Sequence, residues 1–428
     1  MKILIVGSGG REHAIAWALN KTASQPLDIY CAAGNAGMAE TATLVPIAAM
    51  DSHNLARFAE SEAIDLTFVG PEAPLAAGIV DHFQAKGLAI VGPTASAARL
   101  ESSKVFAKDF MTRNGVSTAE YRVAQSPEQA IEFLRSGAFG SSDCPVVVKA
   151  DGLAAGKGVV VANSHAEAKQ AIEDLMINHL AGTEAAARIV LEQALIGTEA
   201  SLLLFADGRD CILMPAARDH KRIGENDTGP NTGGMGSITE HSILSDAQLA
   251  QVVKEIVEPS LIGAERDGFP FKGVLFLGLM LTANGPQLLE YNVRFGDPET
   301  QTILVRLQSD LLSVFEAIHQ ETLGKIKVEW TTGASACVVA ANRGYPGKYE
   351  TGAIIEGLTT VKKPVEIFHA GTTLSSEGKI LATGGRVLGV TAPAPDLPAA
   401  LEHCYRALDK IHWLGMQFRR DIGRKHQT

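Results

Sequence analysis

Long hydrophobic runs and a surplus of basic residues are both missing from this chain of 428 residues. The longest apolar stretch, at 274–281, is far shorter than the roughly 18 residues that cross a bilayer, so we expect no membrane partner. The chain has 38 Lys and Arg against 48 Asp and Glu, and its net charge of −10 offers no basic field that would displace counterions from nucleic acid. We therefore expect no nucleic-acid partner, and local lysines and arginines must hold any anionic ligand.

Cysteine is also scarce. The five cysteines are scattered and odd in number, and none of them forms a C-x-x-C spacing. This usage predicts reduced thiols and argues against both a disulfide framework and a zinc site. Only four apolar residues stand between Lys2 and Gly7, which is too few for a signal peptide. We therefore expect a cytoplasmic protein.

The chain is long enough for about three domains. In the first hundred residues, short apolar runs alternate with helical patterns, which predicts a parallel sheet with helices on both faces. The runs lie at 2–6, 27–33, 65–69 and 88–91, and the helical patterns at 11–19, 51–62 and 76–86. Two of the strands end in Gly-Pro, at the sheet edge where open α/β folds bind ligands.

The middle and last parts of the chain also mix strands and helices. A basic amphipathic helix is expected at 103–114, and capping boxes at Ser126 and Ser164 each begin a further helix. Further strands are expected at 188–195, 273–281, 286–295, 335–342, 365–371 and 386–392, and a last helix runs from Pro398 to about Trp413. Residues 219–236 form a polar, glycine-rich stretch that is too long for a simple connector.

The stretch "VVVKADGLAAGKGVVVA" at 146–162 has the residues of a phosphate site without being a Walker A loop. Asp151 stands where the first Walker glycine belongs, Gly158 stands where the hydroxyl belongs, and a valine strand follows instead of a helix. The pattern predicts a β-hairpin whose loop glycines, including Gly156, let the backbone approach phosphate oxygens. Lys149 and Lys157 can neutralise a polyphosphate, although an ordinary glycine-rich hairpin would look similar.

The turn "GSGGRE" at 7–12 half-matches the dinucleotide-binding fingerprint. Glu12 replaces the third glycine, and the second strand does not end in the acid that would bind a ribose, which disfavours an NAD-dependent oxidoreductase. A phosphate monoester at the helix N-terminus, assisted by Arg11, fits this turn. A turn that serves only strand-to-helix packing is the alternative.

A second stretch rich in charged and polar side chains is "LLEYNVRFGDPETQ" at 288–301. It has Glu290, Asn292 and Arg294 at alternate positions. On a strand, these three side chains would face the same way. Glu290 and Asn292 can supply the oxygen ligands that Mg²⁺ takes together with substrate phosphates. Arg294 can clamp a phosphoryl group or a carboxylate. A half-exposed strand is the alternative.

Together, the lysine before the glycine hairpin, the acid on the strand at 188–195 and the Glu-x-Asn-x-Arg strand resemble the ATP-grasp fold of carboxylate–amine ligases. With "GSGGREHAIAW", "GPTASAARLESSK", "PNTGGMG" and "RFGDPETQ", the chain resembles the phosphoribosylamine–glycine ligase family over residues 7–392. The resemblance implies an α/β fold with three domains. These are an N-terminal parallel-sheet (pre-ATP-grasp) domain at 1–103, an ATP-grasp domain at 104–327 with a hairpin lid at about 122–193, and a mixed α/β domain at 328–428.

The resemblance implies ATP-dependent ligation of glycine to 5-phosphoribosylamine through glycyl phosphate, an early step of purine biosynthesis. It also implies ATP with Mg²⁺ or Mn²⁺ as cofactors, small-molecule partners and a monomer. Another ATP-grasp carboxylate–amine ligase, with a different pair of substrates, is the nearest alternative. A biotin-dependent carboxylase is disfavoured because no Met-Lys-Met-type segment follows. A nucleotide-binding regulator without catalysis would not need the Glu290, Asn292 and Arg294 set.

The resemblance also assigns residues, with Arg294, Lys149 and Asp297 as the catalytic ones and Glu290 and Asn292 as metal ligands. The nucleotide would be lined by Lys104, Lys149, Gly156, Lys157, Gly158, Glu192 (near adenine) and Glu199 (at the ribose). The phosphoribosyl group would meet Gly9, Gly10, Arg11, Gly70, Pro71 and Glu72. The glycine pocket would be shaped by Asp219, Lys221, Asn231, Thr232, Gly233 and Gly234. Many ATP-grasp enzymes carry a further metal carboxylate on the preceding strand, but residues 277–280 hold no acid here.

Overall fold

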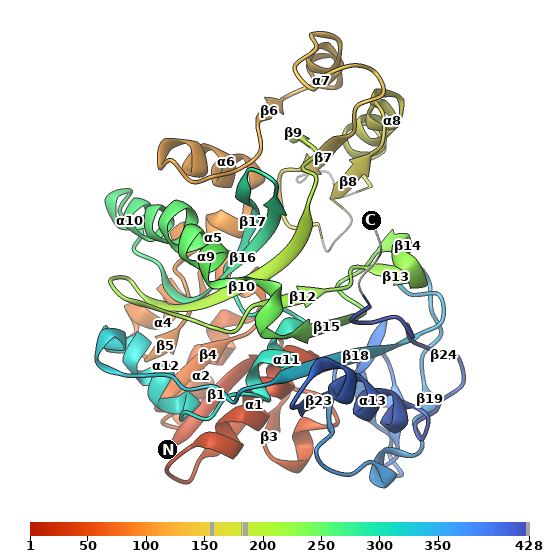
Figure 1. Cartoon of the computed structure of the whole chain (residues 1–428). Coiled ribbons are helices and arrows are strands. Elements are labelled where there is room, and N and C mark those ends of the chain that lie inside the picture. The colour runs from red at the N-terminus through yellow and green to blue at the C-terminus, as the bar shows by residue number, and fades with distance from the viewer. Residues whose placement is uncertain (155–157, 181, 183–186, 425–428) are drawn as a thin grey trace.

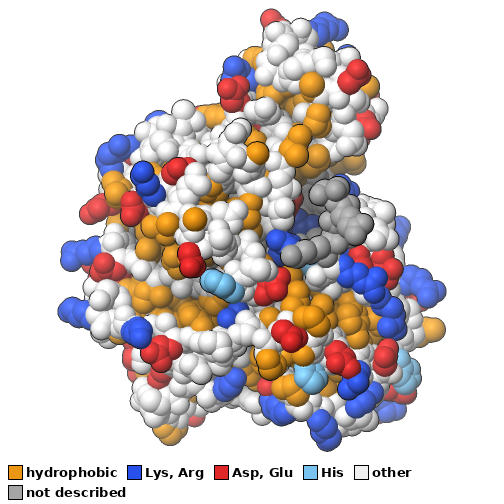
Figure 2. Space-filling view, in the orientation of Figure 1, with side chains coloured by type: hydrophobic (Ala, Val, Ile, Leu, Met, Phe, Trp, Pro, Cys, Tyr) orange, Lys and Arg blue, Asp and Glu red, His pale blue; other side chains and the backbone are white. Residues whose placement is uncertain are grey.

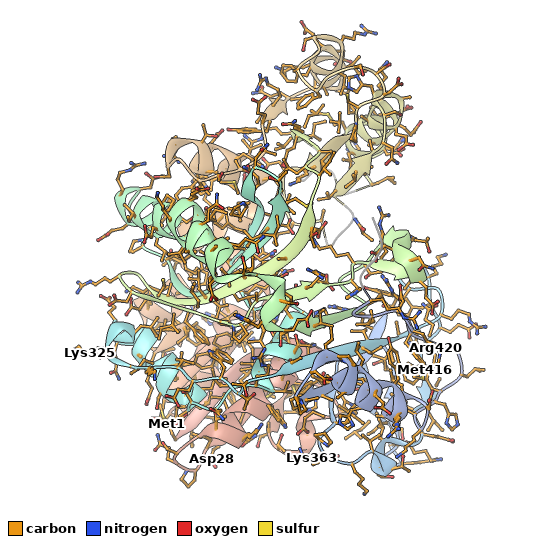
Figure 3. All side chains as sticks on the ribbon, in the orientation of Figure 1. Met1, Asp28, Lys325, Lys363, Met416 and Arg420 are labelled. Atoms are coloured by element: carbon orange, nitrogen blue, oxygen red, sulfur yellow. The ribbon has the colours of Figure 1, made fainter. Side chains whose placement is uncertain are left out.

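The computed structural model describes residues 1–154, 158–180, 182 and 187–424. The chain has the expected α/β fold. In Figure 1 the lid, in ochre and yellow, projects at the top, and the red N-terminal part lies beside the blue C-terminal part below it. The labelled side chains Met1, Asp28 and Lys363 lie along the lower edge, away from the lid (Figure 3).

The N-terminal sheet is parallel throughout, as predicted, with the strand order β3-β2-β1-β4-β5. Its strands are β1 (Lys2–Gly7), β2 (Asp28–Ala33), β3 (Thr43–Val45), β4 (Leu66–Val69) and β5 (Ile90–Val91). Sequence reading missed β3, which has three residues, two of them exposed. The helices are α1 (Gly10–Thr22), α2 (Ser52–Ser61), α3 (Glu72–Ala76), α4 (Ile79–Ala85) and α5 (Ala95–Ser102). The helix expected at 76–86 is present as α4 but begins only at Ile79, because α3 ends at Ala76 and Gly78 takes a left-handed φ of +86° between them.

The lid is a four-stranded antiparallel sheet with the order β6-β9-β7-β8 and its own hydrophobic core. Its elements are β6 (Tyr121–Ala124), α7 (Pro127–Arg135), β7 (Val146–Ala150), β8 (Val159–Ala162), α8 (His165–Met176) and β9 (Ile189–Gln193). The pairing of β7 with β8 confirms the predicted hairpin. Ser126 and Ser164 cap α7 and α8 as predicted, but the Gln129 and Glu167 side chains accept hydrogen bonds from residues 125 and 163, one position before each cap.

A ten-stranded sheet joins the middle and last parts of the chain, because β15 pairs with β18. Its strands are β10 (Thr198–Asp207), β11 (Cys211–Leu213), β12 (Ala217–Asp219), β15 (Gly236–Thr239), β16 (Lys272–Thr282), β17 (Gly285–Asn292), β18 (Ala334–Asn342), β20 (Glu366–His369), β23 (Arg386–Ala394) and β24 (Met416–Gln417). A small sheet contains β19 (Ala353–Ile354), β22 (Ile380–Ala382) and β21 (Thr372–Leu374). The accompanying helices are α6 (Lys104–Arg113), α9 (Asp246–Val252), α10 (Glu258–Arg266), α11 (Glu299–Leu304), α12 (Leu311–His319) and α13 (Leu397–Leu408). The last helix ends earlier than predicted.

The polar stretch 219–236 is more than a simple connector, as its length indicated. It contains a hairpin of β13 (Arg222–Gly224) and β14 (Thr228–Asn231). Arg419, from the end of the chain, donates to the Arg222 carbonyl at 2.9 Å and pairs with Asp227 at 2.8 Å. These distant contacts support the hairpin. In the part of the chain that the structure describes, no helix is long and apolar enough to cross a membrane.

Candidate active site

Three buried charges meet between the lid and α6. The Glu192 carboxylate on β9 lies 2.9 Å from the Lys149 ammonium on β7 and 2.9 Å from the Lys108 ammonium on α6. The exposed fractions of these side chains are 2%, 8% and 3%. Burial, opposed by Glu192 and reinforced by Lys149, lowers the pKa of Lys108 to about 8. Sequence analysis placed Lys149 and Glu192 in the same site. It missed Lys108, although Lys108 lies one helical turn after Lys104.

Asp151, just after β7, connects the glycine loop to the start of α6. Its carboxylate accepts hydrogen bonds from the Ser103 hydroxyl at 2.8 Å and the Val105 amide at 3.1 Å, and it pairs with Arg188 at 2.5 Å. Lys104, the first residue of α6, donates to the Glu101 carbonyl at 3.0 Å. Gly156 and Lys157 lie outside the described residues. Gly158 precedes β8, and a Cβ there would lie only 2.7 Å from the Ala154 side chain.

The Glu290, Asn292 and Arg294 set lies at the end of β17. β17 ends at Asn292, so Arg294 follows the strand instead of lying on it, but it still donates to the Asn292 side-chain oxygen at 3.3 Å. The Glu290 carboxylate makes no hydrogen bond or ion pair with any residue that the structure describes. Burial raises the pKa of Glu290, but Lys221, Lys104 and the other nearby cations outweigh burial and hold it below its usual value. An ionised carboxylate without a partner among the described residues therefore lies near several cations.

These donors fit a divalent ion that is also bound by phosphates. Glu290 and Asn292 both offer oxygen ligands, which Mg²⁺ prefers, and few protein ligands suffice when phosphates and water complete the shell. Gly278 pairs with Glu290 across the sheet, so the preceding strand adds no carboxylate there. Within the described ranges, no group of three or more His, Cys, Asp or Glu could hold a metal on its own.

Arg294 is held by two acids from the N-terminal half. Its Nε lies 3.3 Å from a Glu72 carboxylate oxygen, and its Nη2 lies 3.0 Å from a Glu101 oxygen. Burial lowers the pKa of Arg294, but these acids outweigh burial and raise it above its usual value. Glu101 also accepts from the Val293 amide at 2.7 Å, so it fixes both the backbone and the guanidinium. Sequence reading missed Glu101, although it stands within the "LESSK" motif.

Acids also surround the predicted glycine pocket. Lys221 pairs with Glu199 at 2.9 Å, which brings together two residues that the sequence had assigned to different ligands. Burial, and then repulsion from Glu299, raises the pKa of Asp219 well above its usual value. Burial likewise raises the pKa of Glu299, whose carboxylate accepts from Ser201 at 3.1 Å.

The N-terminal turn is closed by Glu12, the residue that broke the dinucleotide fingerprint. Its carboxylate accepts from the Gly9 amide at 2.7 Å and pairs with Arg11 at 2.5 Å. A Cβ at Gly70, the residue before Pro71 and α3, would overlap the Glu12 side chain. A phosphate at this turn would therefore share it with a carboxylate, and the phosphoribosyl assignment stays a prediction.

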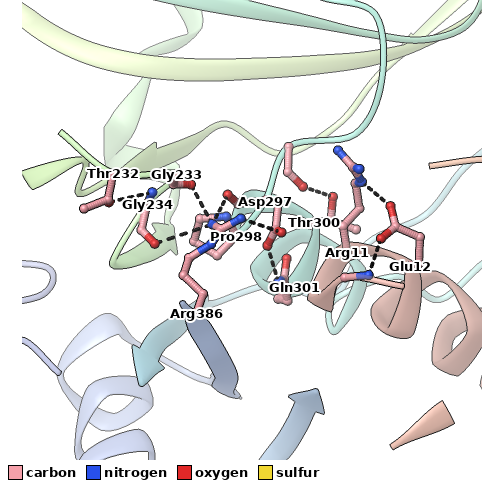
Figure 4. Close-up of polar contacts among 12 residues, drawn as sticks. Arg11, Glu12, Thr232, Gly233, Gly234, Asp297, Pro298, Thr300, Gln301 and Arg386 are labelled. Atoms are coloured by element: carbon pink, nitrogen blue, oxygen red, sulfur yellow. Dashed lines mark hydrogen bonds and ion pairs between the residues drawn. The ribbon is translucent and has the colours of Figure 1, made fainter. Parts of the chain in front are cut away.

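Asp297 lies where three distant segments meet (Figure 4). Its carboxylate accepts from Gln301 Nε2 at 2.7 Å and from Arg386 Nη2 at 2.8 Å. The Arg386 guanidinium also donates to the Gly233 carbonyl at 2.6 Å and the Asp297 carbonyl at 2.7 Å. In the same loop, the Thr232 hydroxyl donates to the Lys221 carbonyl at 2.8 Å and accepts from the Gly234 amide at 2.9 Å. The first residue of this loop, Asn231, ends β14. The roles of Gln301 and Arg386 were missed, although Arg386 begins the strand predicted at 386–392.

Sequence comparison decides the family. Residues 1–101 match the N domain of phosphoribosylglycinamide synthetase, residues 102–300 its ATP-grasp (A) domain and residues 335–425 its C domain. The chain belongs to the phosphoribosylglycinamide synthetase family. The phosphoribosylamine–glycine ligase of Agrobacterium fabrum (strain C58) is 46% identical over 427 residues, which cover 99% of this chain and 98% of the relative. The ligase of the same name from Vibrio cholerae is 44% identical, with 99% and 98% covered.

Solved structures agree with membership of the phosphoribosylglycinamide synthetase family. The phosphoribosylamine–glycine ligase of Thermotoga maritima is 33% identical and superposes with a TM-score of 0.84, covering 98% of this chain and all of that one. The biotin carboxylase domain of the Hydrogenobacter thermophilus 2-oxoglutarate carboxylase reaches a TM-score of 0.74 at 15% identity and covers 97% and 91%. The second similarity shows the shared fold alone. Membership of an ATP-grasp ligase family implies the use of ATP and a divalent metal.

Proposed function

We propose that this protein ligates glycine to 5-phosphoribosylamine at the expense of ATP, through a glycyl phosphate intermediate, in purine biosynthesis. The observation that carries the proposal is the position of Asp297. It lies beside the N-terminal turn predicted for the phosphoribosyl group and is joined through Arg386 to the loop predicted for glycine. Full-length membership of the phosphoribosylglycinamide synthetase family supports it.

In the first step, a glycine carboxylate oxygen attacks the γ-phosphorus of ATP and ADP leaves. Protein groups assist phosphoryl transfer mainly by orienting the groups and offsetting their charge. Lys149 on the lid and Arg294 after β17 are the cations that we assign to this work. Lys104 and Lys157 join them in binding the phosphates.

Glu290 and Asn292 would hold the divalent ion, Mg²⁺ or Mn²⁺. When bound, such an ion supplies positive charge to the phosphates. Because the Glu290 carboxylate has no competing partner among the described residues, it needs no rearrangement to act as a ligand.

In the second step, the phosphoribosylamine nitrogen attacks the activated carbonyl and inorganic phosphate leaves. Water must be excluded, because it would hydrolyse the acyl phosphate. We assign this exclusion to the lid, which has its own core and projects from the rest of the molecule (Figures 1 and 2). The lid hairpin is thus expected to close over ATP and not to act as a Walker loop.

Binding roles follow the same assignment and remain predictions. Gly9, Gly10 and Arg11, with Gly70, Pro71 and Glu72, would meet the phosphoribosyl group. Glu199 would meet the ribose of ATP, and the backbone after Glu192 would meet adenine, because the Glu192 carboxylate is already bound by two lysines. Asp219, Lys221 and the segment 231–234 would surround glycine. Action as a monomer and a cytoplasmic location also remain predictions.

Transfer of ¹⁸O tests the intermediate. If glycine labelled in its carboxylate is activated as glycyl phosphate, one labelled oxygen per turnover must appear in inorganic phosphate. Product without labelled phosphate would contradict this route. If label reached phosphate only when another labelled carboxylate or another amine was supplied, the result would favour a different ATP-grasp carboxylate–amine ligase.

A further inference from the structure

The surroundings of Asp297 indicate what its carboxylate can do. Both carboxylate oxygens are held by donors that themselves are fixed, since Gln301 lies on α11 and Arg386 begins β23. The Asp297 side chain is nevertheless 19% exposed, so these donors do not seal it in the interior. It is therefore oriented without being enclosed.

Asp297 also lies between the two predicted substrate sites. A Cβ built on Gly9 or on Gly10 would lie 3.7 Å from an Asp297 carboxylate oxygen, so the N-terminal turn passes directly beside it. On the other side, Arg386 connects Asp297 to the carbonyl of Gly233. A phosphoribosylamine held by the turn and an acyl group bound at the loop would meet next to this carboxylate.

Two neighbouring acids are less suited to receive a proton from that amine. Glu12 is buried and already binds the Gly9 amide and Arg11. Glu299 is 4% exposed and bound by Ser201. Of these three acids, Asp297 has the most accessible side chain.

We propose that Asp297 accepts the proton of the attacking amine, and that Arg386 and Gln301 are positioning residues that aim its carboxylate. The inference rests on the proposed function. The amine nitrogen forms a bond to the carbonyl carbon of glycyl phosphate, the bond from that carbon to the phosphate oxygen breaks, and phosphate leaves with the electron pair. The surplus proton on nitrogen passes to Asp297. The C-terminal part of the chain thus contributes Arg386 to the ligation step.

This role separates the two half-reactions. Activation of glycine does not need the proton acceptor, whereas capture by phosphoribosylamine does. General-base groups contribute about 100- to 10,000-fold. Loss of the acceptor therefore lowers ligation by about 100-fold or more while glycyl phosphate still forms.

The experiment compares two nucleophiles. Each variant is mixed with ATP, Mg²⁺ and glycine, together with either phosphoribosylamine or hydroxylamine, which captures glycyl phosphate as the hydroxamate. ADP and both products are counted. The variants are Asp297→Asn, Arg386→Met and Arg386→Lys. Arg306→Met is the control, since Arg306 is also largely buried and bonded to a backbone carbonyl but lies outside this cluster.

Asp297→Asn and Arg386→Met should form hydroxamate within a few-fold of the wild type but lose ligation, so that ADP exceeds ligated product. Arg386→Lys should recover part of the ligation, and Arg306→Met should keep one ADP per product. Equal losses with both nucleophiles in the folded Arg386→Lys and Asp297→Asn variants, or unimpaired ligation, would overturn the inference. A wild-type protein that forms neither product would instead refute the proposed function.

Discussion

At the residue scale, the site is built from charges that neutralise one another before any ligand arrives. Glu192 lies between Lys108 and Lys149, and Arg294 lies between Glu72 and Glu101. Glu290 is the exception, since no described residue forms a hydrogen bond or ion pair with its carboxylate. A residue kept ionised by nearby cations, yet unpaired, is the one expected to bind an added ion.

Glu290→Ala should therefore abolish most magnesium-dependent turnover while the fold survives. We expect turnover to fall by at least about 100-fold, because a charged ligand of the ion is lost, and the melting temperature to change little. Turnover is measured against magnesium concentration. Glu402→Ala, which removes an exposed carboxylate paired with Arg406, is the control. Near-normal activity at saturating magnesium would exclude Glu290 as a ligand.

Lys108→Met tests the buried triad. The change leaves Glu192 with one cation in a buried setting, where breaking an ion pair costs about 3–5 kcal/mol. The free energy of unfolding should fall by that order, and the KM for ATP should rise because Lys149 is drawn more strongly to Glu192. Lys86→Met, which breaks an exposed pair with Glu60, should cost less than about 1 kcal/mol. If both variants lost the same free energy of unfolding in urea, burial would not make the Lys108–Glu192 pair more costly to break than the exposed one.

At the element scale, strong local patterns were predicted well, and elements set by distant contacts were not. The parallel strands at 2–6 and 65–69 and the valine hairpin follow from apolar runs bounded by glycine or proline. The β13–β14 hairpin does not, because Arg419, far along the chain, supports it. Likewise, the resemblance suggested which motifs share a site, but no spacing could show that Lys108 or Arg386 joins them.

Asp151 connects two such elements, the glycine loop and α6. Asp151→Ala removes its bonds to Ser103, Val105 and Arg188. We expect the free energy of unfolding to fall by about 1–3 kcal/mol, because the partly buried Ser103 and Val105 donors lose their acceptor. ATP should bind less tightly because the loop loses its anchor. Urea unfolding and ATP titration measure the two effects. Asp143→Ala, an exposed position on the lid, is the control. Unchanged ATP affinity would show that the loop does not depend on this anchor.

At the scale of the whole molecule, the N-terminal sheet domain and the C-terminal part of the chain are joined through buried histidines. His13 on α1 accepts a hydrogen bond from the His369 amide at 2.8 Å, and Asn35 donates to the His369 carbonyl at 2.8 Å. Burial, together with repulsion from His369, lowers the pKa of His13 to about 3, and burial lowers that of His369 to about 4. Both rings are neutral in the folded protein, so acid should loosen this junction.

The free energy of unfolding should fall as the pH drops below about 6.5, because the histidines bind protons in the unfolded chain but stay unprotonated in the folded one. The loss continues until the folded pKa values near 4 and 3 are reached. Between pH 7.5 and 5.5, His13 should account for about 1.4 kcal/mol of the fall in the free energy of unfolding. His13→Asn keeps an acceptor for the His369 amide without titrating, so its loss in urea unfolding should be smaller by that amount. His241→Asn, at an exposed site, should match the wild type. If His13→Asn lost as much free energy of unfolding between pH 7.5 and 5.5 as the wild type, His13 would not be a source of the pH dependence.

In the proposed reaction, glycine and phosphoribosylamine are joined at the expense of ATP. The most direct measurement is ADP release with ATP and magnesium, adding glycine and freshly prepared phosphoribosylamine singly and together. We expect rapid ADP release only when both are present, with one glycinamide ribonucleotide formed per ADP. Equal release without either substrate, or only with another amine, would contradict it.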